Sequence, residues 1–240
     1  MRLADLHTHI LPGVDDGAAR VEDSLALLRA EKEQGVTDVV LTPHFLPESS
    51  DIKTSTERWR LAFEELLRAV RNEDLPALYG GCEVLYFEGM GKSSAVKQLC
   101  MGKSNYILIE FASMKIGDNV ISDLTDLRYN IGVIPIIAHT ERYFDFKGFK
   151  KLKKLFEDGI CLAQLNASSL AGGAYKRAAL KLIKEDLIYI VASDVHSLNY
   201  RPCELSEAFC VIKEHFGKSR VNRYISNSGK LLLNISGETE

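Results

Sequence analysis

The chain has 240 residues, of which 46% are hydrophobic, and carries a formal net charge of −3 with a pI near 6.1. This length and apolar content suffice for a substantial core, so we expect residues 1–240 to form a single domain. The charge shows no basic excess of the kind that nucleic-acid binding needs, and no apolar run approaches the roughly 20 residues of a membrane span. We therefore expect no nucleic-acid partner and no membrane insertion.

Short β-branched apolar runs alternate with amphipathic stretches along the chain. We predict strands at 2–5, 38–42, 77–82, 106–109, 133–138, 161–165 and 188–193. We predict helices between them at 22–34, 55–72, 93–101, 120–129, 149–158 and 175–185. Such alternation is typical of β-α units around a parallel sheet.

The cysteines indicate a reducing compartment. There are five, an odd number, and none forms a Cys-x-x-Cys pair. Most lie in apolar stretches, as expected of reduced core thiols. We therefore expect a cytoplasmic protein.

The first predicted strand opens the most informative segment, D-L-H-T-H-I-L-P-G-V-D-D-G at positions 5–17. His7 and His9 are two residues apart, so on a strand both side chains lie on the same face and can bind one ion. Asp16 follows within a Pro-Gly turn. The segment predicts a metal site, although a histidine pair of this kind also occurs without a metal.

Further histidines and carboxylates follow the later strands. The full set of candidate ligands is His7, His9, Asp16, His44, Glu83, Glu110, His139, Asp194 and His196. Taken singly, several have an ordinary alternative, such as a solvated loop acid, a turn residue or a core histidine. A carboxylate that ends an apolar strand, as Glu110 and Asp194 do, is costly to bury unless it is paired or metal-bound.

The positions of these residues, each after a predicted strand, distinguish between two possible α/β architectures. An open, doubly wound sheet gathers only the strand ends near its switch point, whereas a barrel gathers all of them at one mouth. We therefore predict a distorted (β/α)7, TIM-like barrel. The loops at 45–54 and 85–92 are long and are expected to overhang that mouth.

Nine ligands suit two or three divalent ions. Imidazole and carboxylate ligands without thiolate fit Mn²⁺, Fe²⁺ or Zn²⁺. Closely spaced divalent ions activate water and stabilise charge on phosphoryl oxygens, which predicts phosphate ester hydrolysis. Arg142 and Arg201 follow His139 and His196 by a few residues and are candidates for binding phosphate, with salt bridges at the rim as the alternative role.

Other phosphate chemistries lack their motifs. Gly-Lys-Ser occurs three times, but the glycine that a phosphate-binding loop requires further upstream is missing each time. None of the cysteines is followed six residues later by the arginine of cysteine-based tyrosine phosphatases. Phosphate removal would therefore depend on the metal ions.

These residues closely resemble a known superfamily. Segment 5–17, T-P-H at 42–44, Glu83, Glu110, H-T-E-R-Y at 139–143 and S-D-V-H at 193–196 resemble the PHP (polymerase and histidinol phosphatase) superfamily. The long H-I-L-P-G-x-D-D-G signature is similar to its CpsB/CapC/YwqE branch of bacterial manganese-dependent protein-tyrosine phosphatases. The resemblance covers nearly the whole chain.

The resemblance implies a PHP barrel with a trinuclear site. One ion would be held by His7, His9, Glu83 and Asp194, and a second by Glu83, Glu110 and His139. The third would be held by Asp16, His44 and His196. Arg142 and Arg201 match the phosphate-contacting arginines of the family. Mn²⁺ is the implied cofactor, as two or three ions, with Fe²⁺ or Zn²⁺ as alternatives.

The resemblance also implies a substrate, phosphotyrosine in the tail of a bacterial tyrosine kinase that controls capsule or exopolysaccharide synthesis. Two other functions stay open. One is a different PHP phosphoesterase, such as a histidinol-phosphate phosphatase, which usually lacks the turn at 11–17. The other is a non-catalytic, metal-stabilised binding module, against which the complete ligand set argues.

Overall fold

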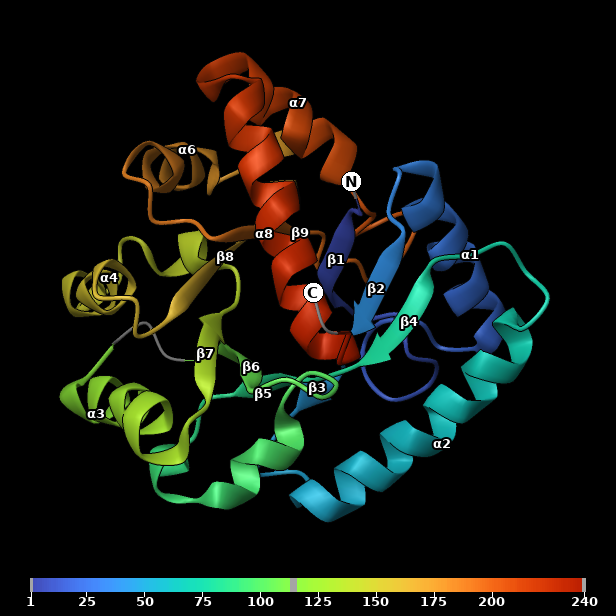
Figure 1. Ribbon diagram of the computed structural model, residues 1–240, viewed down its shortest axis with the longest axis horizontal. Coiled ribbons are helices and arrows are strands. Elements are labelled where there is room, and N and C mark those ends of the chain that lie inside the picture. Colours follow the sequence, from blue (N-terminus) through green and yellow to red (C-terminus); the bar gives the residue numbers. More distant parts are fainter. Residues whose placement is uncertain (1, 113–115, 239–240) are drawn as a thin grey trace.

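The computed structural model describes residues 2–112 and 116–238 (Figure 1). Its strands are β1 (Ala4–Thr8), β2 (Asp38–Leu41), β3 (His44–Phe45), β4 (Ala77–Gly80), β5 (Glu83–Leu85), β6 (Tyr106–Glu110), β7 (Ile134–Ile137), β8 (Leu162–Asn166) and β9 (Ile190–Ala192). Its α-helices are α1 (Val21–Glu33), α2 (Ile52–Val70), α3 (Asp118–Asp126), α4 (Phe149–Glu157), α5 (Ser168–Ala171), α6 (Lys176–Lys184), α7 (Leu205–Phe216) and α8 (Lys218–Ser236). Within this part of the chain, none of the helices combines the length and apolar character that a membrane crossing requires.

The predicted α/β fold with parallel strands is confirmed, with local differences. The predicted helix at 93–101 is a 3₁₀ helix, Ser94–Leu99. The first strand runs to Thr8 rather than Asp5, so His7 lies inside it. The register between β1 and β2 also shifts between Asp5 and Thr8, where the histidine pair begins.

The strands pair in two parallel sheets, ordered β1-β2-β4 and β3-β5-β6-β7-β8-β9. β2 and β3 are consecutive in the chain and are separated by Thr42 and Pro43, because proline has no N–H to donate to a ladder. β4 and β5 are likewise consecutive in the chain and are separated by Gly81 and Cys82, beside the break between β2 and β3. Two backbone hydrogen bonds cross the interruption, from Gly81 N–H to Leu41 O (2.9 Å) and from Glu83 N–H to Pro43 O (3.0 Å).

The first strand also contacts the segment that follows the last strand. Thr8 forms an isolated parallel bridge with Val195. Asp194 N–H donates to His7 O and His9 N–H donates to Val195 O, each over 2.9 Å. The pairing of the described strands gives two sheets and not one closed barrel, so the seven-stranded barrel stays a prediction.

The core lies on both faces of the strands. A larger cluster fills the space between the strands and the surrounding helices. On the other face, Leu6, Leu108 and Ile136 pack against Leu231 and Ile235 of α8, which crosses in front of the strands in Figure 1. Because side chains alternate along a strand, the residue two positions beyond an inner apolar residue faces the same way. The inner face therefore changes from apolar to polar toward the carboxyl ends of the strands.

Candidate metal centre

The nine predicted ligands lie together at the carboxyl ends of the strands. They lie in, or in the segment after, β1 (His7, His9, Asp16), β3 (His44), β5 (Glu83), β6 (Glu110), β7 (His139) and β9 (Asp194, His196). Eight of them fall into adjoining groups with donor atoms close enough to hold metal ions, and His139 contacts Glu83 and Glu110 of one such group. The structure thus brings together every residue of the predicted set.

The first group surrounds the Nε2 atoms of the histidine pair. His7 Nε2 lies 3.2 Å from His9 Nε2, 3.3 Å from Glu83 Oε2 and 3.4 Å from Asp194 Oδ1. His9 Nε2 lies 3.3 Å from the same Glu83 oxygen and 3.5 Å from the same Asp194 oxygen. Four ligand atoms placed tetrahedrally about 2.1 Å from an ion lie about 3.4 Å apart. The group therefore fits a divalent ion.

Glu83 connects this group to a second one. Its Oε1 lies 3.0 Å from His139 Nε2, and its Oε2 lies 3.1 Å from His44 Nδ1. Glu110 completes the second group, 3.3 Å from His44 Nδ1 and 3.6 Å from His139 Nε2. Glu83 is fully buried, and a carboxylate at such a place needs positive charge around it.

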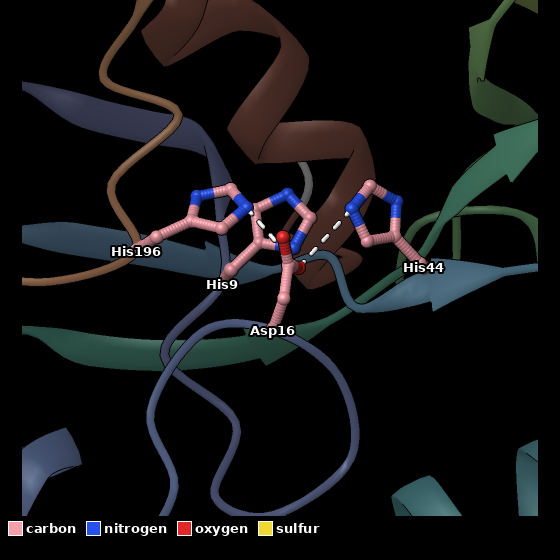
Figure 2. A group of neighbouring side chains, drawn as sticks. All are labelled: His9, Asp16, His44 and His196. Atoms are coloured by element: carbon pink, nitrogen blue, oxygen red, sulfur yellow. Dashed lines mark ion pairs between the residues drawn. The ribbon is translucent and has the colours of Figure 1, made fainter. Parts of the chain in front are cut away.

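The third group, Asp16, His44 and His196, is drawn together with the neighbouring His9 in Figure 2. Asp16 Oδ1 lies 3.4 Å from His44 Nε2 and 3.4 Å from His196 Nε2. The Asp16 side chain is 62% exposed, whereas His196 is 4% exposed. His44 stands between the second and third groups, with Nδ1 facing one and Nε2 facing the other.

The loop that carries Asp16 is held tightly against His9. Ala18 N–H donates to His9 O over 3.0 Å, and Gly13 N–H donates to Ala18 O over 2.8 Å. A Cβ atom on Gly17 would overlap the His9 carbonyl, so only glycine fits this turn. Asp15 accepts a hydrogen bond from Gly17 N–H (3.0 Å) and contacts His9 Nδ1 (2.8 Å).

Four site histidines have a protein partner at Nδ1 and present Nε2 to the other ligands. The partners are Gln164 for His7 (3.2 Å), Asp15 for His9 (2.8 Å), Tyr143 for His139 (3.0 Å) and the backbone oxygen of Asp194 for His196 (2.9 Å). Such partners fix ring orientation and turn Nε2 toward the other candidate ligands. The sequence prediction included none of these roles. Asp15 and Tyr143 could have been found from the sequence, because they lie within the motifs at 5–17 and 139–143. Gln164 lies in no such motif.

Asp194 uses its two oxygens differently. Oδ2 accepts hydrogen bonds from Asn166 (2.5 Å), Arg142 (3.0 Å) and Arg201 (2.5 Å). Oδ1 is buried and has no hydrogen-bond partner among the described residues, and it faces His7 and His9. A buried carboxylate oxygen without a donor is what a metal ligand requires.

The pKa shifts reflect the concentration of carboxylates. Burial alone would lower the pKa of His7, but Glu83 and Asp194 outweigh burial and raise it to about 9. Burial likewise opposes a charged His44, whose pKa is nevertheless raised to about 11 by Glu110 and Glu83. Burial and the neighbouring His9 lower the pKa of His196 to about 4. The first two groups therefore favour positive charge in the centre.

Two predicted ligands have strained backbones. His139 has φ of 32° and Asp194 has φ of 57°, in the left-handed region. Non-glycine residues there cost about 1–3 kcal/mol each and gather at functional sites. His139 N–H donates to Gln164 Oε1 (2.7 Å) and Asp194 N–H to His7 O (2.9 Å), which helps to hold both conformations.

The chain is similar to known proteins over nearly its whole length. Residues 3–234 match the family model described as capsular polysaccharide synthesis, CpsB/CapC. The tyrosine-protein phosphatase CpsB of Streptococcus agalactiae serotype III (strain NEM316) is 30% identical over 97% of this chain and 99% of that protein. The tyrosine-protein phosphatase YwqE of Bacillus subtilis (strain 168) is 31% identical over 96% of this chain and 91% of that protein.

A solved structure is also similar over nearly the whole chain. It is described as belonging to YwqE from Bacillus subtilis and CpsB from Streptococcus pneumoniae, unique metal-dependent tyrosine phosphatases. It superposes with a TM-score of 0.84 at 30% identity and covers 97% of this chain and 95% of the other. The chain therefore belongs to the CpsB/CapC family.

Proposed function

We propose that this protein is a metal-dependent protein-tyrosine phosphatase. The observation that carries the proposal is the convergence of nine ligand side chains on one site with two arginines on a shared carboxylate. The family relatives named tyrosine-protein phosphatases support it. An ion cluster beside paired guanidinium groups suits a phosphate monoester dianion.

We assign one metal ion to each of the three groups of donor atoms. His7, His9, Glu83 and Asp194 would hold one ion; Glu83, Glu110 and His139 a second; and Asp16, His44 and His196 a third. Mn²⁺ is the proposed ion, with Fe²⁺ or Zn²⁺ as alternatives, because the ligands are nitrogen and oxygen without thiolate. When bound, the ions supply Lewis acidity toward water and the phosphoryl group.

Arg142 and Arg201 would bind the phosphate. Both donate to Asp194 Oδ2, so both guanidinium groups lie at one edge of the ligand set. Their side chains are 34% and 39% exposed, which leaves nitrogens accessible to a substrate. A phenolate leaving group has a pKa near 10 and needs less protonation than an alkoxide.

A cavity beside the ligands offers space for the substrate. Its volume is about 410 Å³, and it is lined by Asp15, Asp16, His44 and Glu110 together with Leu46, Ser49, Ser50 and Arg58. Leu46, Ser49 and Ser50 in this lining belong to the loop at 45–54, which we expected to overhang the site. A phosphotyrosine in an extended tail, such as that of a bacterial tyrosine kinase in capsule or exopolysaccharide synthesis, is the proposed occupant. The cytoplasmic location stays a prediction.

We also propose that the chain is one PHP domain spanning 1–240, with its two sheets arranged as a distorted (β/α)7 barrel. The bonds across Pro43 and Gly81 and the Thr8 to Val195 bridge support this arrangement. The ligands at the carboxyl ends of the strands lie where barrel enzymes place their active sites.

One assay tests the proposed function. The purified protein is offered a phosphotyrosine peptide, histidinol phosphate and a phosphodiester, each with Mn²⁺ or with EDTA. We expect Mn²⁺-dependent release of phosphate from the peptide, with a higher kcat/KM than for the other two. Preference for histidinol phosphate contradicts the proposed substrate, and failure to hydrolyse any of them with Mn²⁺, Fe²⁺ or Zn²⁺ favours the binding module.

A further inference from the structure

Strand β8 carries no predicted metal ligand, yet it supplies two buried amides to the centre. Gln164 and Asn166 lie on the same face of β8 and are 0% and 1% exposed. Leu162 precedes them on that face and packs with the inner core. The strand thus places an amide pair directly behind the ligands.

The direction of each hydrogen bond in this pair is fixed by a backbone group. His139 N–H can only donate, and it donates to Gln164 Oε1 over 2.7 Å. The other end of the Gln164 amide is therefore NH₂, which donates to Asn166 Oδ1 over 2.8 Å. Asn166 Nδ2 then donates to Asp194 Oδ2 over 2.5 Å. No other orientation of the two amides satisfies all three contacts.

The orientation of the Gln164 amide also determines which nitrogen of His7 is protonated. Its Nδ1 lies 3.2 Å from Gln164 Oε1, an oxygen that can only accept, so Nδ1 must carry the proton. Nε2 is then the only His7 nitrogen that can bind a metal ion. It faces His9 Nε2, Glu83 Oε2 and Asp194 Oδ1.

The end of β8 is itself held in place. Asn166 N–H points at the Glu141 carboxylate, with both oxygens 3.4 Å away. Ser169 Oγ donates to Glu141 Oε1 over 2.7 Å. Glu141 belongs to the segment that carries Arg142, so the amide pair is joined to the phosphate side of the centre as well.

We propose that Gln164 and Asn166 are positioning residues for the metal centre. Gln164 fixes the His7 tautomer and supports the strained His139 backbone, while Asn166 occupies Asp194 Oδ2 and thereby turns Oδ1 toward the ion. The inference rests on the proposed metal-dependent function. Removing a partner of this kind typically weakens metal affinity by about 10–100-fold.

Two variants test the pair, with one matched control. Gln164→Met keeps the length of the side chain and removes both amide groups, and Asn166→Leu keeps the branched shape and leaves the Gln164 contacts to His7 and His139 available. Gln34→Met is the control, because Gln34 is a half-buried glutamine whose partners are Cys203 O and Ser206 N–H, two backbone groups outside the predicted ligand set. Metal affinity is measured by chelator competition with Mn²⁺ and Zn²⁺.

We expect Gln164→Met to weaken the tightest site by about 10–100-fold. Asn166→Leu should weaken it less, and the control should stay within about threefold of the original protein. Equal affinities for all three variants and the original protein overturn the inference, provided that circular dichroism shows each to be folded.

A spectroscopic readout separates positioning from general loss of stability. In the Zn²⁺-loaded, ¹⁵N-labelled protein, long-range ¹H–¹⁵N spectra should show His7 protonated at Nδ1, with slow solvent exchange of that proton. Gln164→Met should accelerate the exchange or change the tautomer, and Gln34→Met should not. A His7 spectrum unchanged by Gln164→Met overturns the inference. If the original protein binds metal and cleaves phosphotyrosine while this result holds, only the positioning role fails; if it binds no metal, the proposed function fails first.

Discussion

Arg201 Nη1 lies 2.7 Å from Nε2 of His196 and donates a hydrogen bond to it. That nitrogen is the atom His196 offers toward Asp16, since its Nδ1 is bonded to the Asp194 backbone oxygen. The guanidinium group and an ion at the proposed third site would therefore compete for the same lone pair. Binding of an ion there would require Arg201 to withdraw, which would free it to contact a phosphate.

The competition predicts opposite effects of Arg201→Ala on metal binding and on turnover. The third ion should bind more tightly, because His196 Nε2 loses its donor, while kcat/KM for a phosphotyrosine peptide should fall by about 10²-fold. Isothermal titration with Mn²⁺ and steady-state kinetics measure the two effects. Arg223→Ala, which removes a guanidinium paired with Asp186, is the control. A parallel loss of affinity and activity would contradict the competition.

Arg142→Ala should chiefly reduce turnover. Its guanidinium contacts the Asp194 oxygen that faces away from the ion groups, so metal affinity should change by less than about tenfold while kcat falls by about 10²-fold. Metal content and kcat measured on the same preparation check this. A variant that loses its metal together with its activity would assign Arg142 a structural role.

Asp194→Asn should abolish metal binding in the first group. Three donors converge on Oδ2, so an asparagine would place its carbonyl oxygen there and turn its NH₂ toward His7 and His9. We expect loss of the bound metal and at least about 10³-fold lower kcat/KM, and the same for His9→Ala.

The control for that substitution is Asp186→Asn. Asp186 is another aspartate with positive φ, 61°, and its partners are Arg220 and Arg223 on the surface. Metal content by mass spectrometry should be normal in this control. Full activity in the Asp194→Asn or His9→Ala protein would refute the site.

Metal affinity should rise with pH. The raised pKa values of His7, about 9, and His44, about 11, mean that both rings are imidazolium cations at pH 7 when no ion is bound, each with a second proton on the nitrogen that would bind metal. Ligation must displace those protons, so apparent affinity increases about tenfold per pH unit for each proton released. Chelator competition at pH 6, 7 and 8, with calorimetry in buffers of different ionisation enthalpy, measures the effect. An affinity independent of pH would contradict the protonation of these histidines.

A buried carboxyl pair behind the centre predicts a second pH effect, on stability. Glu31 and Asp5 are both fully buried, and Glu31 Oε2 has no hydrogen-bond partner in the described part of the chain. Burial and the nearby Asp5 raise the pKa of Glu31 well above 4.5. The folded protein therefore retains a proton that the unfolded chain releases, and this contribution to stability falls as pH rises toward the folded pKa.

Glu31→Gln should remove this loss of stability at high pH, because an amide does not ionise in this pH range. We expect the fall in Tm between pH 6 and pH 9 to be smaller in the variant than in the original protein. Thermal unfolding in the presence of EDTA measures it without a contribution from metal. Glu33→Gln, on the exposed side of the same helix, is the control, and an identical pH dependence in all three proteins would show that Glu31 is ionised when folded.

The sequence located the candidate ligands because their chemistry is visible in single residues. Histidine and carboxylate at successive strand ends are distinctive, and parallel strands in an α/β fold bring those ends together. The clustering of His7, Glu110 and Asp194 could therefore be predicted without coordinates. The hydrogen bonds of Gln164 and Asn166 behind those residues could not be predicted. A glutamine or asparagine on a strand has no sequence pattern that distinguishes a partner of a metal ligand from an ordinary core amide.

The division into two sheets was also beyond the sequence pattern. Pro43 signals an end to β2, but nothing in the apolar run indicates that the chain resumes pairing at His44 and Phe45 as β3. The shift of β1 to Ala4–Thr8 depends on pairing with β2 and on bonds to Asp194 and Val195, far away in the chain. Such non-local contacts override local strand preference.

The contact between β1 and the segment after β9 sets the order of events during synthesis. Asp5 accepts a hydrogen bond from Ser193 N–H across 188 positions, and His7 faces Asp194 over a similar interval. At a translation rate of about 5–20 residues per second, roughly 10–40 s separate the emergence of these partners from the ribosome. The nascent chain presents His7 and His9 long before their partners exist, so the proposed metal centre could be completed only when synthesis is nearly finished.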